Sequence, residues 1–170
     1  MTEKFVYKNK ALEQIFKRFN RDFTRFDDII KPLDVEDLAY ELGLVVRFEN
    51  NINKSGELSE NNEIIVNSKD HVFRQRFTVA HEIGHYILGH GPSDRNVQRK
   101  YTDEELNNEI RANQFAAELL VPEYKVKELW QKNNYDINDI EYIVEDMVIF
   151  FAVSTSVIQN RLINLGLIKL

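Results

Sequence analysis

The chain has 170 residues, 43% of them hydrophobic, which suits one globular domain with its own core. Its net charge of −6 argues against a general nucleic-acid surface, and the absence of cysteine excludes disulfides and cysteine-based zinc knuckles. No apolar run approaches membrane-spanning length, and residues 1–26 lack the uninterrupted apolar core of a signal peptide. We expect a single domain over residues 1–170, in which about 131–170 form a helical C-terminal extension.

The first part of the chain predicts two helices followed by a small sheet. Apolar residues at helical spacing indicate the first helix, and a cap at Asp34 with a stop at Gly43 indicates the second. Two β-type runs separated by the turn-rich segment 50–56 then predict a sheet, which we expect to be antiparallel. The expected elements are a helix at about 10–26, a helix from Asp34 to Leu42, and strands at 44–48 and 63–67.

A metal-binding pattern, H-E-x-x-H, follows the second strand as His81-Glu82-Ile83-Gly84-His85. Residues four apart on a helix lie about 40° apart on one face, so His81 and His85 can offer two imidazole nitrogens to one metal. Glu82 then lies beside a metal-bound water without binding the metal. We expect a buried stripe on the same helix, which Gly89 ends. The stripe consists of Phe73, Phe77, Ala80, Gly84 and Ile87.

Beyond this helix the chain predicts a polar loop and then helices to its C-terminus. The loop, residues 91–101, is a candidate rim of a cleft, although most surface loops have no specific role. A capping box at Thr102 begins the next helix, and Pro122 opens the one after it. The expected helices run from Thr102 to about Leu120, from Pro122 to about Lys132, over a stripe from Ile140 to Phe151, and from the cap Ser154 to Gly166.

A zinc site needs a third protein ligand. A metzincin pattern would require glycine at 88 and histidine at 91, and Gly89 and His90 are each one position off, so His90 and His71 receive no role as metal ligands. Glu109 and Glu118 lie on opposite faces of the helix after the capping box. Glu118 shares a face that looks solvated, whereas Glu109 shares a face with small alanines that can approach Gly84. We therefore expect Glu109 as the third ligand, with Asn113 one turn later orienting a ligand histidine.

Two segments carry a specific resemblance, Arg74-Gln75-Arg76-Phe77-Thr78-Val79-Ala80-His81-Glu82-Ile83-Gly84-His85-Tyr86 and Glu109-Ile110-Arg111-Ala112-Asn113-Gln114-Phe115-Ala116-Ala117-Glu118-Leu119-Leu120-Val121-Pro122. Together they resemble the ImmA/IrrE family of zinc metallopeptidases, over about residues 35–166. The resemblance implies an α+β, zincin-like fold of the gluzincin type, with a small antiparallel sheet packed on the H-E-x-x-H helix. It also implies Zn²⁺ bound by His81, His85 and Glu109, a catalytic role for Glu82, and a cytoplasmic protein that cleaves a helix-turn-helix repressor.

The expected reaction is peptide-bond hydrolysis, with Glu82 as general base. Tyr86, Tyr101, Tyr124 and His90 remain open as oxyanion donors, and the edge of the sheet is a candidate site for an extended substrate. An alternative function is a zinc-stabilised protein that sequesters a repressor without cutting it, but a retained Glu82 favours hydrolysis. Direct DNA binding through the last helices is disfavoured because residues 138–170 are acidic.

Overall fold

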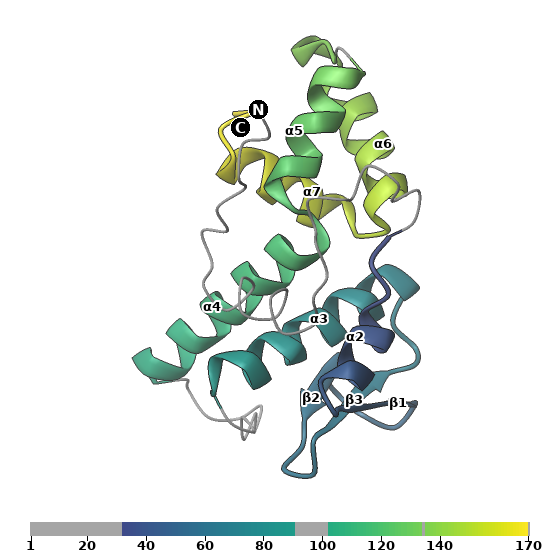
Figure 1. Ribbon diagram of the computed structural model, residues 1–170, viewed down its shortest axis with the longest axis vertical. Coiled ribbons are helices and arrows are strands. Elements are labelled where there is room, and N and C mark those ends of the chain that lie inside the picture. The colour runs from purple at the N-terminus through teal and green to yellow at the C-terminus, as the bar shows by residue number, and fades with distance from the viewer. Residues whose placement is uncertain (1–31, 91–101, 134, 170) are drawn as a thin grey trace.

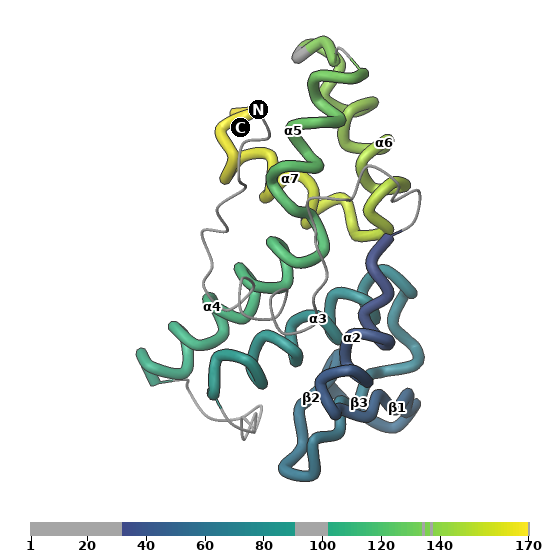
Figure 2. Tube along the Cα trace, in the orientation of Figure 1, coloured from purple at the N-terminus to yellow at the C-terminus, as the bar shows by residue number. Residues whose placement is uncertain are grey.

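The computed structural model describes residues 32–90, 102–133 and 135–169, and Figures 1 and 2 show their arrangement. The elements are α2 (Val35–Glu41), β1 (Val45–Glu49), β2 (Gly56–Leu58), β3 (Glu63–Asn67), α3 (Val72–Leu88), α4 (Asp103–Leu120), α5 (Glu123–Lys132), η2 (Ile137–Asp139), α6 (Ile140–Phe151) and α7 (Thr155–Asn164). The sheet and α2 lie at one end, α5, α6 and α7 gather at the other, and α3 and α4 lie between them (Figure 1). The helix expected at 10–26 and the loop at 91–101 lie outside the described residues.

The sheet is mixed, so the expectation of an antiparallel sheet is wrong. Its strand order is β1-β3-β2, with β1 parallel to β3 and β2 antiparallel to β3. The cause is β2, which sequence reasoning did not assign because its first residue, Gly56, looked like part of a turn. From β2 the chain reverses over residues 59–62 and returns as the central strand β3. This route makes β3 run in the same direction as β1.

Helix α3 packs against one face of this sheet. Ile64 and Val66, at alternating positions of β3, are fully buried, as expected of a strand with one face on the core. At the edge strand β2, a Cβ on Gly56 would overlap the Thr78 methyl group of α3 and would lie 2.7 Å from the Ile65 carbonyl oxygen. Glycine is therefore required where β2 approaches α3. The contact between Gly56 and Thr78 places the edge strand beside the H-E-x-x-H helix.

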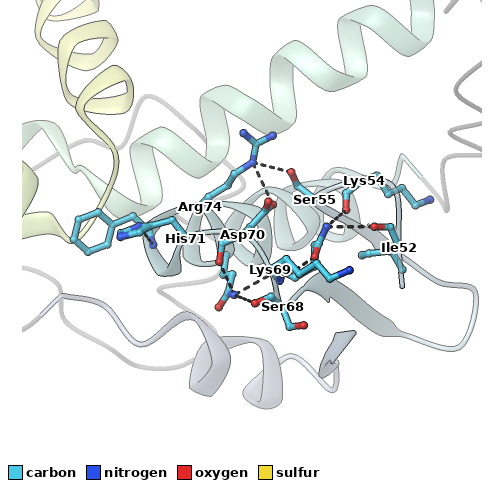
Figure 3. Close-up of polar contacts among 11 residues, drawn as sticks. Ile52, Lys54, Ser55, Ser68, Lys69, Asp70, His71 and Arg74 are labelled. Carbon is cyan, nitrogen blue, oxygen red and sulfur yellow. Dashed lines mark hydrogen bonds and ion pairs between the residues drawn. The ribbon is translucent and has the colours of Figure 1, made fainter. Parts of the chain in front are cut away.

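A network of polar contacts holds the first turn of α3 against the loops that flank β2 and β3 (Figure 3). Arg74 Nε donates to Ser55 Oγ at 2.8 Å and lies 3.2 Å from an Asp70 carboxylate oxygen. Gln75 Nε2 donates to the Asp70 carbonyl at 2.8 Å, and Asn67 Nδ2 donates to the Lys54 carbonyl at 3.3 Å. These contacts fix where α3 begins relative to the sheet.

The middle of α3 is buried on more faces than the single stripe expected. Every residue from Thr78 to His85 is buried, whereas Phe73, Phe77 and Ile87 are only half-buried. The reason is that the sheet covers one side of the helix and α4 covers another. Gly84 allows α4 to approach, because a Cβ there would lie 3.3 Å from the Ala112 backbone.

Most of the helix ends follow their expected signals. Asp34 accepts from two backbone N–H groups of α2, the capping box at Thr102 is formed, and Gly89 ends α3 with a φ of 68°. The cap expected at Ser154 is an exception, because its hydroxyl makes no capping hydrogen bond and lies 3.0 Å from Ser156 Oγ. Local sequence therefore sets the ends of three helices, and the last helix begins without a side-chain cap.

The C-terminal helices share one hydrophobic cluster with the rest of the described chain, and this cluster contains residues of every α-helix from α2 to α7. Arg76 of α3 adds a polar link, since it donates to the Leu33 carbonyl at 2.8 Å and to the Ala152 carbonyl at 3.2 Å. Burial lowers the pKa of Arg76. Among the described helices, none is both long and apolar enough to cross a bilayer.

Candidate metal centre

Helix α3 places His81 and His85 side by side at its buried centre. The side chains are 9% and 2% exposed. Their rings meet edge to face with centroids 4.7 Å apart, and the two Nε2 atoms lie 3.0 Å from each other. The spacing of four residues thus brings two imidazole nitrogens to one point, as the helix geometry requires.

Helix α4 brings Glu109 to the same point. One carboxylate oxygen lies 3.3 Å from His81 Nε2 and the other lies 3.3 Å from His85 Nε2. A ligand atom from each of the three residues lies within 4.8 Å of the others. An ion held tetrahedrally with bonds of about 2.1 Å keeps its ligand atoms about 3.4 Å apart. The separations in the structure are close to that value, so the three side chains fit a zinc ion.

Asn113, one turn after Glu109, orients His81. Its Oδ1 lies 3.0 Å from His81 Nδ1. An amide oxygen can only accept, so His81 carries its proton on Nδ1 and presents a lone pair at Nε2. That lone pair faces the Glu109 carboxylate, and two acceptors in contact require a cation or a proton between them. The donor set therefore favours a metal at this point.

Glu82 lies beside the histidines and is only 1% exposed. It lines the same cleft as His81 and Glu109. Because Glu82 comes one residue after His81, it points about 100° round the helix axis and stays out of the cluster of three ligand atoms. A carboxylate in this place can exchange a proton with a molecule bound in the cleft.

The cleft has a volume of about 800 Å³ and opens between α3, α4, α7 and the start of β2. Its α7 wall is largely polar, with Ser156, Asn160 and Asn164 beside Val157. Arg74 lies at the α3 wall, and Figure 3 shows the two terminal nitrogens of its guanidinium pointing away from Asp70 and Ser55, which contact its Nε atom. The cleft is therefore large enough for a peptide segment and offers hydrogen-bonding groups on two sides.

One feature of the site differs from the sequence expectation. Glu118 was expected on a solvated face and is half-buried, because Arg161 of α7 packs beside it at 3.9 Å. Of the candidate oxyanion donors, Tyr86, Tyr124 and His90 are not among the described residues that line the cleft, and Tyr101 lies outside the described residues. Sequence alone gave no distance from these groups to the cleft.

His90 lies beside His85, which sequence reasoning missed. His90 received no ligand role because it is one position away from the place that a metzincin pattern requires. In the structure Gly89 adopts a left-handed conformation, which turns His90 back so that its Nδ1 lies 3.2 Å from His85 Nδ1. Burial lowers the pKa of His90, and nearby His85 and Arg111 lower it further. The signal in the sequence was a histidine directly after a C-terminal glycine cap.

Known proteins resemble this chain in family pattern, in sequence and in fold. The family model described as IrrE N-terminal-like domain, Peptidase M78, matches residues 39–163. The radiation response metalloprotease IrrE of Deinococcus radiodurans is 40% identical over 76 residues, which is 43% of this chain and 23% of that protein. A Mycobacterium tuberculosis transcriptional regulator has a similar fold, with a TM-score of 0.56 and 14% identity over 92% of this chain and 47% of that one.

The chain thus spans about half of the solved structure and about a quarter of the metalloprotease. The match at 14% identity concerns the fold alone. The family model, in contrast, covers most of the chain, including α3 and α4 with the cluster of His81, His85 and Glu109. The chain belongs to the ImmA/IrrE family, the metallopeptidase family of the IrrE N-terminal-like domain.

Proposed function

We propose that this protein is a zinc-dependent endopeptidase that cuts a peptide bond in a specific regulatory protein, a helix-turn-helix repressor. The observation that carries the proposal is the convergence of His81, His85 and Glu109 on one point, with Glu82 beside them and an open cleft in front. This is the side-chain set that a catalytic zinc site uses, three protein ligands with a further position for water. The proposal places the protein in the cytoplasm, where repressors act.

The metal ligands in this proposal are His81 Nε2, His85 Nε2 and a Glu109 carboxylate oxygen. A bound zinc ion supplies a water of lowered pKa and polarises the scissile carbonyl. Asn113 keeps His81 in the tautomer that leaves Nε2 available, through the 3.0 Å contact at Nδ1. The role of Asn113 in this proposal is thus to orient a ligand.

Glu82 acts as the general base. Its carboxylate accepts a proton from the attacking water and then gives this proton to the leaving amine, so that one group serves both half-reactions. Burial at 1% exposure keeps the carboxylate away from bulk water. Its position next to His81 on the rigid centre of α3 holds it at a fixed distance from the reacting bond.

The substrate segment lies extended in the cleft in this proposal. Ser55, just before β2, and Gly56, its first residue, line the cleft, and within the described part of the chain β2 is an edge strand that pairs with β3 alone. An edge strand can accept an additional strand from a partner through backbone hydrogen bonds, which bind without regard to side chains. Selectivity then comes from docking of the folded partner on surfaces outside the cleft, such as the acidic helix α6.

The test is a cleavage assay with zinc-loaded protein, in which the repressor encoded beside its gene and casein are offered in parallel. We expect the repressor to be cut at one or a few bonds while casein remains intact. The matched control is Glu82→Gln, which should keep its zinc and its fold and lose hydrolysis, because only the proton acceptor is removed.

The other outcomes separate the alternatives. Rapid digestion of casein with an intact repressor would reject a regulatory substrate. Repressor binding without any cut would favour sequestration. Cleavage by Glu82→Gln at the rate of the parent protein would show that Glu82 is not the general base.

A further inference from the structure

His90 holds a defined position behind His85. Its backbone N–H donates to the His85 carbonyl at 3.0 Å, and the two rings meet edge to face with centroids 5.2 Å apart. The two Nδ1 atoms, one from each ring, lie 3.2 Å apart. Gly89, with a φ of 68°, is the residue that permits this return of the chain.

This geometry excludes His90 as a metal ligand. The Nε2 atom of His85 faces Glu109, and the Nδ1 atom that His90 contacts lies on the other side of the same imidazole ring. His90 therefore approaches His85 from behind, away from the point where the three ligand atoms converge. A histidine in this place can act on the metal site only through His85.

We propose that His90 is a positioning residue, which accepts a hydrogen bond from His85 Nδ1–H and so keeps the His85 Nε2 lone pair directed at the metal. The inference rests on the metal site of the proposed function. A ligand histidine commonly donates its second ring N–H to a neighbouring acceptor, which fixes both its tautomer and its orientation. Neutral imidazole offers such an acceptor at one nitrogen.

The two ligand histidines are then held in matching ways by groups from different elements. Asn113 of α4 contacts His81 Nδ1 at 3.0 Å, and His90 at the end of α3 contacts His85 Nδ1 at 3.2 Å. The Nε2 atom of His90 is buried without a hydrogen-bond partner among the described residues. A buried, unsatisfied ring nitrogen is unfavourable. An apolar side chain would fill the same space without that cost, so packing alone does not explain a histidine at this position.

The experiment measures the dissociation constant for Zn²⁺ by competition with a chelator in the full chain. His90→Phe fills the space without offering an acceptor, and His90→Gln offers an amide oxygen. We expect His90→Phe to weaken zinc binding about 10- to 100-fold, the range typical of such outer contacts, and His90→Gln to recover most of the loss. With Co²⁺ in place of zinc, the absorption spectrum of His90→Phe should differ from that of the parent protein.

The matched control is His71→Ala, at the other end of the same helix. His71 accepts from the Phe73 N–H at 3.3 Å, so its loss weakens a helix cap and should leave the zinc affinity unchanged. Zinc affinity of His90→Phe within twofold of the parent, or equal affinities of His90→Phe and His90→Gln, would overturn the role of His90. A parent protein that binds no zinc would instead overturn the proposed function together with this inference.

Discussion

The close approach of α3 and α4 predicts a specific cost for adding one methyl group at Gly84. A Cβ there would lie 3.0 Å from Phe115 Cδ1 and 3.3 Å from the Ala112 Cα and carbonyl oxygen. Phe115 and Ala112 are fully buried, so neither can move into solvent. Overpacking of this kind costs about 1–3 kcal/mol, and the better helix propensity of alanine returns about 1 kcal/mol.

We therefore expect Gly84→Ala to destabilise the metal-free protein by about 1 kcal/mol, or a few degrees in Tm for a chain of this length. Zinc affinity should fall as well, because the methyl group pushes against the turn of α4 that follows Glu109. Phe115→Leu removes the nearest atom, so the double variant should lose less stability than the sum of the two single variants.

The assays are urea unfolding of the metal-free protein and chelator competition for zinc. A Gly84→Ala variant that gains the full 1 kcal/mol expected from helix propensity would refute the close packing of the two helices. Additive effects of Gly84→Ala and Phe115→Leu would refute the contact between these two positions.

Further predictions concern the scaffold. Arg76→Ala removes two charged hydrogen bonds to carbonyl groups of other segments and should lower the free energy of unfolding by about 3 kcal/mol in urea titrations. The control Arg47→Ala removes an exposed ion pair and should cost under about 1 kcal/mol. Thr102→Ala opens the capping box of α4 and should cost about 1 kcal/mol in the same titrations. Burial and the hydrogen bond to Asp146 raise the pKa of Tyr135 to about 12, so any stability linked to this phenol is present below pH 10 and lost towards pH 12. Tyr135→Phe should remove a step near pH 12 from an absorbance titration.

The sequence was informative wherever local chemistry decides the structure. The capping box at Thr102 and the glycine cap at Gly89 mark helix ends through backbone hydrogen bonds made within a few residues. Periodicity on the helix after the capping box was enough to choose Glu109 as the inward carboxylate, and the structure brings its oxygens to 3.3 Å from both histidines. The ligand and catalytic roles themselves remain predictions.

The features that the sequence did not give depend on distant contacts. Three residues are too few to show the alternation of a strand, and β2 exists because Gly56 fits against Thr78 and pairs with β3. The mixed sheet follows from this strand. Glu118 looked solvated because its partner Arg161 lies more than forty positions away in sequence. The turn that directs His90 to His85 likewise depends on backbone conformation at one glycine.

The most direct test of the account is the zinc content of two variants of the same helix, Glu109→Ala and Glu118→Ala, measured beside the parent protein. Both changes remove a half-buried glutamate from α4, and only Glu109 contacts His81 and His85. We predict one zinc ion per chain in the parent and in Glu118→Ala, and loss of the metal in Glu109→Ala. Equal zinc content in the two variants would contradict the assignment of the metal site.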